Sequence, residues 1–138
     1  MINPRGTLKM TYTFYCLAAA FLLTYLTKLP LAMAMAKEGE SGYDNRNPRD
    51  QQARLTGWGR RSLAAHQNSF EVTPLFAAAI ITAYLFQADA YWSAVWATIF
   101  LISRILYIFF YIRDVNLMRS TVWMVGIASC IALFVLAA

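Results

Sequence analysis

Residues 62–86, SLAAHQNSFEVTPLFAAAIITAYLF, are the stretch on which the interpretation of this chain depends. The second half is apolar, whereas His66, Asn68 and Glu71 all lie in the first half. At about 1.5 Å per residue, a helix of this length crosses the roughly 30 Å hydrocarbon core of a bilayer. The stretch therefore predicts a membrane helix with polar groups toward one side of the membrane.

The composition of the whole chain also indicates a membrane protein. Its 138 residues are 59% hydrophobic and only 14% charged, whereas soluble domains average roughly 45–50% apolar and about 25% charged residues. A soluble domain of this size cannot bury so much apolar surface, and a disordered chain needs low hydrophobicity. The composition argues against a cytosolic globular enzyme and favours an all-α integral membrane protein.

Three further apolar stretches predict membrane helices that complete a four-helix bundle. We expect helices at about 10–36, 62–86, 91–112 and 117–136, in a single domain that covers residues 1–138. The segment 37–61 is rich in charged and turn-forming residues, and we expect it to form a polar loop with at most a short helical start after Pro48.

A cleavable signal peptide is the competing interpretation of the first apolar stretch. Arg5 and Lys9 are typical of a basic n-region, and Ala34-Met35-Ala36 is typical of a cleavage site. The apolar stretch is longer than the usual h-region of roughly 7–15 residues, which favours a retained helix.

The positive charge predicts how the chain is oriented in the membrane. Its formal net charge is +5, and most Lys and Arg residues lie in or beside the connections 37–61 and 113–116. Loops that carry an excess of Lys and Arg stay in the cytoplasm. We therefore expect the loop 37–61 on the cytoplasmic side and both termini on the opposite side.

Neither nucleic acid nor a metal ion is an expected partner. Nucleic-acid binding needs a basic patch on a soluble face, and the chain is mostly apolar. Cys16 and Cys130 lie in apolar runs without the spacing of metal ligands or of a disulfide framework. We expect both thiols to act as small apolar side chains.

Polar side chains are predicted to share faces in the cytoplasmic half of the bundle. At about 100° per residue, Arg61, Asn68 and Glu71 fall within about 80° on their helix. The same arithmetic places three residues of 91–112 within about 60°, with Asp114 extending that face: Arg104, Tyr107 and Tyr111.

The convergence of these groups has two interpretations. An Arg or Asp at a helix centre costs about 2.5–3.5 kcal/mol on insertion scales, so Glu71 and Arg104 need partners. They can pair with each other in a network that only holds the helices together. Alternatively, the excess of cations, the tyrosines and the helix start at Arg119-Ser120 indicate an anion-binding site. The sequence leaves both open.

The polar motifs resemble those of the MAPEG family, the membrane-associated proteins of eicosanoid and glutathione metabolism. Asn68 and Glu71, three residues apart and followed by Pro74, resemble the helix 2 signature of that family. The loop 43–49 resembles that of bacterial members. The chain also contains residues that resemble the helix 3 motif of the family, Arg104, Tyr107 and Tyr111. The pair Arg119-Ser120 resembles the start of its helix 4.

The resemblance implies a homotrimer that binds glutathione as co-substrate, between neighbouring subunits and near the cytoplasmic face. It also implies that the first helix is retained. Asn68 and Glu71 would bind the glutathione backbone, with Glu71 placed for the amino group. The carboxylates and peptide groups of glutathione would contact the helix 3 residues, Arg104, Tyr107 and Tyr111.

The resemblance also assigns residues on the first and fourth helices. Lys28 stands where family members have a basic residue on helix 1. Arg119 would stabilise the glutathione thiolate, and Ser120 would donate a hydrogen bond to it. The sequence departs from some members at Gln67, where they have a basic residue, and at Trp123, where they have an aromatic hydroxyl.

The function implied is that of a membrane-bound glutathione transferase or peroxidase of the bacterial inner membrane. Its second substrate would be a lipophilic electrophile or a lipid hydroperoxide that arrives from the membrane lipid. A non-enzymatic lipid-binding or scaffold member of the same fold is one alternative. A small proton-coupled exporter that uses Glu71 is another, although such exporters carry their carboxylate in the first helix.

Overall fold

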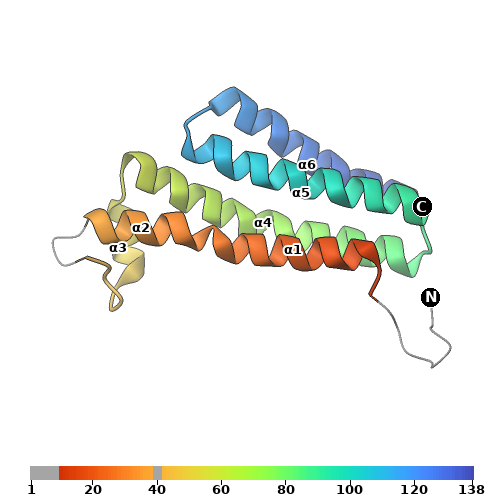
Figure 1. The fold of residues 1–138 in the computed structure, drawn as a ribbon, viewed down its shortest axis with the longest axis horizontal. Helices are drawn as coiled ribbons and strands as arrows, with labels where there is room; N and C mark the ends of the chain where they lie inside the picture. Colours follow the sequence, from red (N-terminus) through yellow and green to blue (C-terminus); the bar gives the residue numbers. More distant parts are fainter. Residues whose placement is uncertain (1–9, 39–41) are drawn as a thin grey trace.

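The computed structural model describes residues 10–38 and 42–138, and the described residues form a set of helices. Arg5 and Lys9, expected in the N-terminal flank, lie outside the described residues. The helices are α1 (Tyr12–Leu26), α2 (Lys28–Glu38), α3 (Pro48–Arg54), α4 (Gly57–Leu85), α5 (Ala90–Ile112) and α6 (Asn116–Leu136). Figure 1 shows α1 and α2 end to end, alongside α4, with α5 and α6 as a hairpin on the other side of α4.

Three helices of the described part of the chain are long and apolar enough to cross a membrane. They are Tyr12–Glu38, Ala90–Ile112 and Asn116–Leu136, with mean hydropathy between 1.6 and 1.9. The 29-residue helix α4 is longer than any of its neighbours α1, α5 and α6, but its polar first half keeps it out of this group. The chain is therefore an all-helical membrane protein, and a fourth spanning helix stays a prediction.

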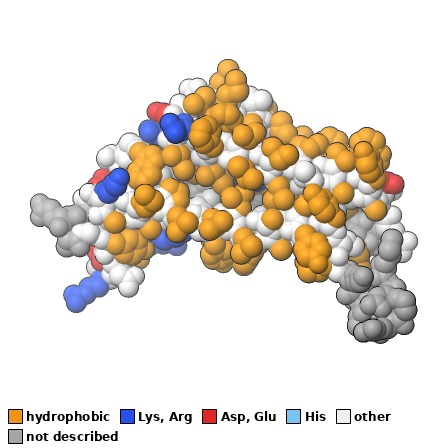
Figure 2. Space-filling model, in the orientation of Figure 1, with side chains coloured by type: hydrophobic (Ala, Val, Ile, Leu, Met, Phe, Trp, Pro, Cys, Tyr) orange, Lys and Arg blue, Asp and Glu red, His pale blue; other side chains and the backbone are white. Residues whose placement is uncertain are grey.

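The surface of the helices is largely apolar. Large hydrophobic side chains such as Leu22, Phe86 and Val135 are more than 60% exposed. On the face shown in Figure 2, hydrophobic side chains cover the length of the molecule, and Lys and Arg gather at the end that carries α3 and the α5–α6 turn. An apolar surface flanked by a basic end is the pattern that a bilayer requires.

The main core lies where α1, α4, α5 and α6 meet. Phe76 of α4 and Phe100 of α5 are fully buried and stack with ring centroids 3.9 Å apart and an interplanar angle of 7°. The same core contains both cysteines, Cys16 and Cys130, as free buried thiols. They act there as small apolar residues, as the sequence indicated.

The first predicted helix is interrupted once. Helices α1 and α2 together run from Tyr12 to Glu38, against the expected 10–36, and Thr27 separates them. Pro30 has no N–H to donate to the carbonyl of Leu26, and this missing bond explains a break at this point. At the break, the Thr27 hydroxyl donates to the carbonyl of Thr24.

The loop expected at 37–61 contains more helix than the sequence indicated. Helix α3 lies inside it, and α4 begins at Gly57 rather than at 62. The reason is a second small core, in which Leu31 and Met35 of α2 pack against Leu55, with Trp58 at its edge. Because these apolar side chains are buried together, the residues just before the expected membrane helix fold as its first turns.

Buried glutamine holds the remaining polar segment against α2. Gln51 is 5% exposed, and its Nε2 donates to the carbonyls of Met35 and Gly42, both at 2.9 Å. Its Oε1 accepts from the backbone N–H of Asp44 at 2.9 Å. The described part of the loop is therefore fixed by hydrogen bonds from Gln51 to the loop backbone and to the backbone of α2.

We predict that Gly126 is required for the close contact between α5 and α6. A Cβ at this position would lie 2.8 Å from Ser103 Oγ, which is itself bound to the carbonyl of Phe100. Gly126→Val should lower the free energy of unfolding by about 1–3 kcal/mol, the usual effect of overpacking. Thermal unfolding in detergent measures this effect.

Ala128→Val on the exposed side of α6 is the matched control and should change stability little. The milder variant Gly126→Ala should be rescued by Ser103→Gly, because this second change removes the clashing side chain. Equal stabilities of Gly126→Val and Ala128→Val would contradict the prediction.

Candidate functional site

A chain of hydrogen bonds joins α5 to two residues of α4. Arg104 Nη2 donates to Asn68 Oδ1 at 2.9 Å, and Asn68 Nδ2 donates to Glu71 Oε2 at 3.0 Å. The Asn68 amide thus stands between a guanidinium and a carboxylate, and it uses both ends of its side chain. Because a carboxamide both donates and accepts, Asn is the residue type that can make this bridge.

Arg104 lies deep in the helix packing. It is 4% exposed, and its guanidinium carbon lies 4.2 Å from the centre of the Tyr107 ring. Glu71, in contrast, is exposed on α4. The Asn68 side chain therefore connects a buried cation, Arg104, to a carboxylate at the surface of the chain, Glu71. Arg104 and Glu71 are connected through Asn68, as a structural network would require, and Glu71 stays accessible.

A polar groove lies next to this bridge, on the α5–α6 hairpin. It has a volume of about 400 Å³. Arg119 lies over Tyr111, with its guanidinium carbon 4.6 Å from the ring centre. The rings of Tyr111 and Tyr107 meet edge to face at 5.3 Å, so the aromatic contacts run on from Arg119 to Arg104. The groove is lined by Tyr107, Tyr111, Arg119, Ser120, Trp123 and Met124.

The helix geometry explains why these residues meet. Tyr107 and Tyr111 are four apart on α5, and Arg119 and Trp123 are four apart on α6, so each pair lies on one helix face. The short turn between the helices makes them antiparallel and brings the two faces together. Sequence reasoning named Trp123 as the i+4 neighbour of Arg119 and as a departure from the family pattern. It missed Met124, which is 58% exposed and resembles any lipid-facing residue.

Four predicted site residues do not line the groove. Asn68, Glu71 and Arg104 form the hydrogen-bonded bridge, and Lys28 belongs to neither the bridge nor the groove. Lys28 begins α2, and its Nζ lies 5.7 Å from the ring centre of Tyr43. The neighbouring Thr27 shares a 2.7 Å hydrogen bond with His66 Nδ1. Lys28 thus lies where α2 meets α4, apart from the α5–α6 face that carries the groove.

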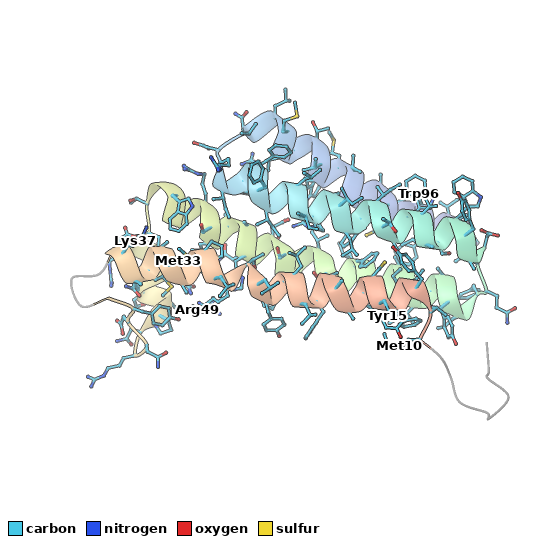
Figure 3. The ribbon with its side chains drawn as sticks, in the orientation of Figure 1. Met10, Tyr15, Met33, Lys37, Arg49 and Trp96 are labelled. Atoms are coloured by element: carbon cyan, nitrogen blue, oxygen red, sulfur yellow. The ribbon has the colours of Figure 1, made fainter. Side chains whose placement is uncertain are left out.

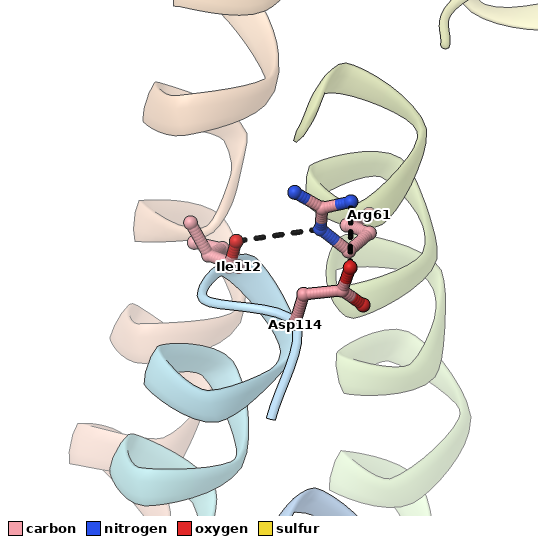
Figure 4. Close-up of polar contacts among 3 residues, drawn as sticks. All are labelled: Arg61, Ile112 and Asp114. Atoms are coloured by element: carbon pink, nitrogen blue, oxygen red, sulfur yellow. Dashed lines mark hydrogen bonds and ion pairs between the residues drawn. The ribbon is translucent and has the colours of Figure 1, made fainter. Parts of the chain in front are cut away.

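An ion pair joins the start of α4 to the α5–α6 turn. Arg61 Nη1 lies 3.3 Å from Asp114 Oδ2, and Arg61 Nε donates to the carbonyl of Ile112 at 3.4 Å (Figure 4). Among the residues that the structure describes, this is the only ion pair between side chains. The sequence had placed Arg61 and Asp114 on the two polar faces without predicting that they meet.

The groove belongs to the basic end of the molecule. The α5–α6 turn that precedes Arg119 lies at the same end as α3 (Figure 1). Lys37 and Arg49 also lie toward this end, whereas Met10, Tyr15 and Trp96 lie toward the other (Figure 3). Within residues 10–38 and 42–138, no group of three or more His, Cys, Asp or Glu side chains is placed to hold a metal ion. The arrangement offers cations and hydroxyls to an organic anion.

Comparison with known proteins agrees with the motifs in this groove. The family model described as the MAPEG family matches residues 12–138, which is nearly the whole chain. No curated protein and no solved structure matches the chain. The matched span includes every helix, the Arg104–Asn68–Glu71 bridge and the groove around Arg119. The chain belongs to the MAPEG family.

Proposed function

We propose that the chain is a membrane-bound glutathione-dependent transferase or peroxidase. The observation that carries this proposal is Arg119, which is held over Tyr111 beside Ser120 in an open groove. The first turn of α6 adds unpaired N–H groups and the positive end of a helix dipole, which favour an anion. Family membership supports glutathione-related chemistry in general.

The groove suits glutathione in size and in charge. Sites for small molecules have volumes of roughly 300–1,000 Å³, and this groove has about 400 Å³. Glutathione carries two carboxylates, one ammonium group and a thiol. We assign the glutathione backbone to Asn68 and Glu71, with its ammonium group at the Glu71 carboxylate, and the carboxylates and peptide groups to the helix α5 residues. These are Arg104, Tyr107 and Tyr111.

Arg104 contributes to this site mainly through its neighbours. Its guanidinium is buried and already bonded to Asn68, so it fixes the amide that orients Glu71. It also lies against the Tyr107 ring, which lines the groove. A glutathione carboxylate that reaches this depth would gain a charge-assisted hydrogen bond without a further desolvation of the cation.

The chemistry is that of an activated thiolate. A free thiol has a pKa of about 8.5, which a neighbouring cation lowers, so Arg119 favours the thiolate of glutathione and Ser120 donates a hydrogen bond to it. Attack on an electrophilic carbon forms a C–S bond as the leaving group departs. Attack on a hydroperoxide gives an alcohol and glutathione sulfenic acid, which a second glutathione converts to the disulfide and water.

The lipophilic substrate would enter along α6. Trp123 and Met124 line the groove and are 38% and 58% exposed. They continue the polar groove into the apolar surface of the helix. An electrophile dissolved in membrane lipid can therefore approach the thiolate from the bilayer, while glutathione arrives from the aqueous side.

We further propose that the protein works as a homotrimer in a bacterial inner membrane. In this assembly glutathione would lie between subunits, and Lys28 from a neighbouring copy would complete the site that the single chain leaves open. The excess of Lys and Arg at the end that bears the groove supports a cytoplasmic site and non-cytoplasmic termini.

A lipid-binding member without catalytic turnover is the alternative function. The observation that favours it is an apolar groove of about 700 Å³ between α1 and α4. Its walls include Phe14, Leu17 and Phe21 of α1, and Pro74 of α4. Binding of lipid by a purified protein that neither binds glutathione nor turns it over would decide for this alternative.

We predict that Arg119→Ala lowers the rate of glutathione transfer about 100-fold or more while the protein stays folded. Removal of one group that stabilises a reacting anion lowers kcat by about 100-fold or more. The measurement is the rate of addition of glutathione to a chlorodinitrobenzene by purified protein in detergent. Absence of any heat of glutathione binding to the wild-type chain would refute the proposed function.

Arg113→Ala is the matched control for this variant. It removes the same charge from an exposed residue at the end of α5, whose nearest aromatic partner is Phe109 at 5.4 Å. We expect near wild-type rates from it. Equal rates for Arg119→Ala and Arg113→Ala would show that Arg119 does not act on the thiolate.

We predict that Glu71→Gln weakens glutathione binding by removing the partner of its ammonium group. The loss of one charge-assisted hydrogen bond corresponds to about tenfold in Kd. Thermal stability should stay near wild type, because Glu71 is exposed and a Gln Oε1 can still accept from Asn68. Isothermal titration calorimetry measures the change in Kd.

A glutathione analogue without the amino group separates this role from a general loss of charge. It should bind the wild-type chain about tenfold less tightly, and Glu71→Gln should cause no further loss with this ligand. If the variant weakens both ligands equally, the ammonium group does not bind Glu71.

A further inference from the structure

The ion pair between Arg61 and Asp114 joins the start of α4 to the turn between α5 and α6. The Asp114 side chain is 66% exposed and that of Arg61 is 30% exposed, and exposed pairs contribute little to stability. Arg61 nevertheless makes two contacts at once, to the Asp114 carboxylate and to the Ile112 carbonyl (Figure 4). Arg61 therefore contacts the α5–α6 turn through the side chain of Asp114 and through the backbone carbonyl of Ile112.

The backbone of Asp114 supports a specific use of its carboxylate. Asp114 has φ 63°, in the left-handed region, at the point where α5 ends. The N–H of Asp114 binds the carbonyl of Tyr111, and the N–H of Val115 binds that of Phe110, a helix end at which Gly is the usual residue. An Asp at this position is less favourable than Gly, and the Asp114 carboxylate provides the contact to Arg61.

Only two places join α4 to the α5–α6 hairpin by polar side-chain contacts among the residues that the structure describes. One is the buried bond from Arg104 to Asn68, and the other is the Arg61 contact at the turn. Arg61 and Asn68 are seven residues apart, which is about 10 Å along a helix. The Arg104 contact lies near the apolar core that α4 shares with the hairpin, and the Arg61 contact lies at the tip of the hairpin.

Arg119, which the proposed function places beside the glutathione thiolate, lies near the tip of the α5–α6 hairpin. Arg119 follows Asp114 by little more than one helical turn, and its N–H binds the carbonyl of Val115. Glu71 and Asn68 lie on α4, whereas Tyr111 and Arg119 lie on the hairpin. A ligand that binds both sets of residues must span α4 and the α5–α6 hairpin. Its affinity therefore depends on the angle between the hairpin and α4.

We propose that Arg61 and Asp114 are positioning residues that hold Arg119 at the correct distance from Glu71 and Asn68. This inference rests on the proposed function, because the ligand that spans the two bodies is glutathione. The pair does not contact the ligand. It acts by limiting the tilt of the α5–α6 hairpin against α4, and it also neutralises Arg61, which would otherwise be a third cation near the site, after Arg104 and Arg119.

The test uses Asp114→Gly, in which stability and binding should change in opposite directions. Glycine adopts the left-handed conformation without the steric cost that Asp has there, so thermal stability should be equal to or higher than that of the wild-type chain. The Kd for glutathione should nevertheless rise by about tenfold, the scale of one misplaced charge-assisted hydrogen bond. A purely structural role of Asp114 would give an unchanged Kd.

Two further variants separate position from charge. Arg60→Gln removes the same charge as Arg61→Gln from an adjacent exposed residue, so only Arg61→Gln should raise the Kd. The exchange of the two charges, Arg61→Asp with Asp114→Arg, should restore most of the affinity that either single change removes, because the contact can form in reverse.

The outcomes distinguish this inference from the function on which it rests. A wild-type chain that binds no glutathione overturns both. A wild-type chain that binds glutathione as tightly as Asp114→Gly and Arg61→Gln overturns the positioning role alone. Tighter binding by Asp114→Gly also overturns it, because this result would mean that the released Arg61 acts directly as a ligand for the anion.

Discussion

The bond between Arg104 and Asn68 is the constraint on which the arrangement of this molecule depends. A guanidinium placed among apolar helices needs a partner, since the removal of one partner from a buried charge is strongly destabilising. The side-chain carbonyl of Asn68 accepts a hydrogen bond from Arg104, and its Nδ2 donates a hydrogen bond to Glu71. Helices α4 and α5 are therefore joined at a defined depth, and a carboxylate is held at the surface of α4.

The aromatic residues of α5 extend this constraint to α6. Arg104 lies against Tyr107, Tyr107 meets Tyr111, and Arg119 lies over Tyr111. The close approach of α5 and α6 at Gly126 makes the hairpin a compact unit. The cation of Arg119 thus lies on the hairpin, and the carboxylate of Glu71 lies on α4. The angle between the hairpin and α4 sets the geometry of any ligand that contacts both residues.

Much of the architecture follows from patterns that can be read in the residues. The apolar stretches at 91–112 and 117–136 match α5 and α6 closely, because hydrophobic length is a strong local signal. The start of α4 was placed too late, since Leu55 and Trp58 are buried by contact with α2 and not by the membrane. Helical phase placed Tyr107 and Tyr111 on one face of their helix, and the packing of α5 on α6 brings Arg119 to the same groove. Met124 carries no signal that separates it from a lipid-facing residue.

The sequence by itself determined that the chain enters a membrane, where its long apolar helices lie to within a few residues, and which polar residues share a helix face. These properties depend on hydrophobic length and on the angle per residue, which are local. Only the tertiary structure decided that Asn68 bridges Arg104 and Glu71, that Arg61 pairs with Asp114, and that Lys28 lies away from the groove. Such pairings depend on how whole helices pack against each other, and helix periodicity places no limit on the partner that a side chain meets.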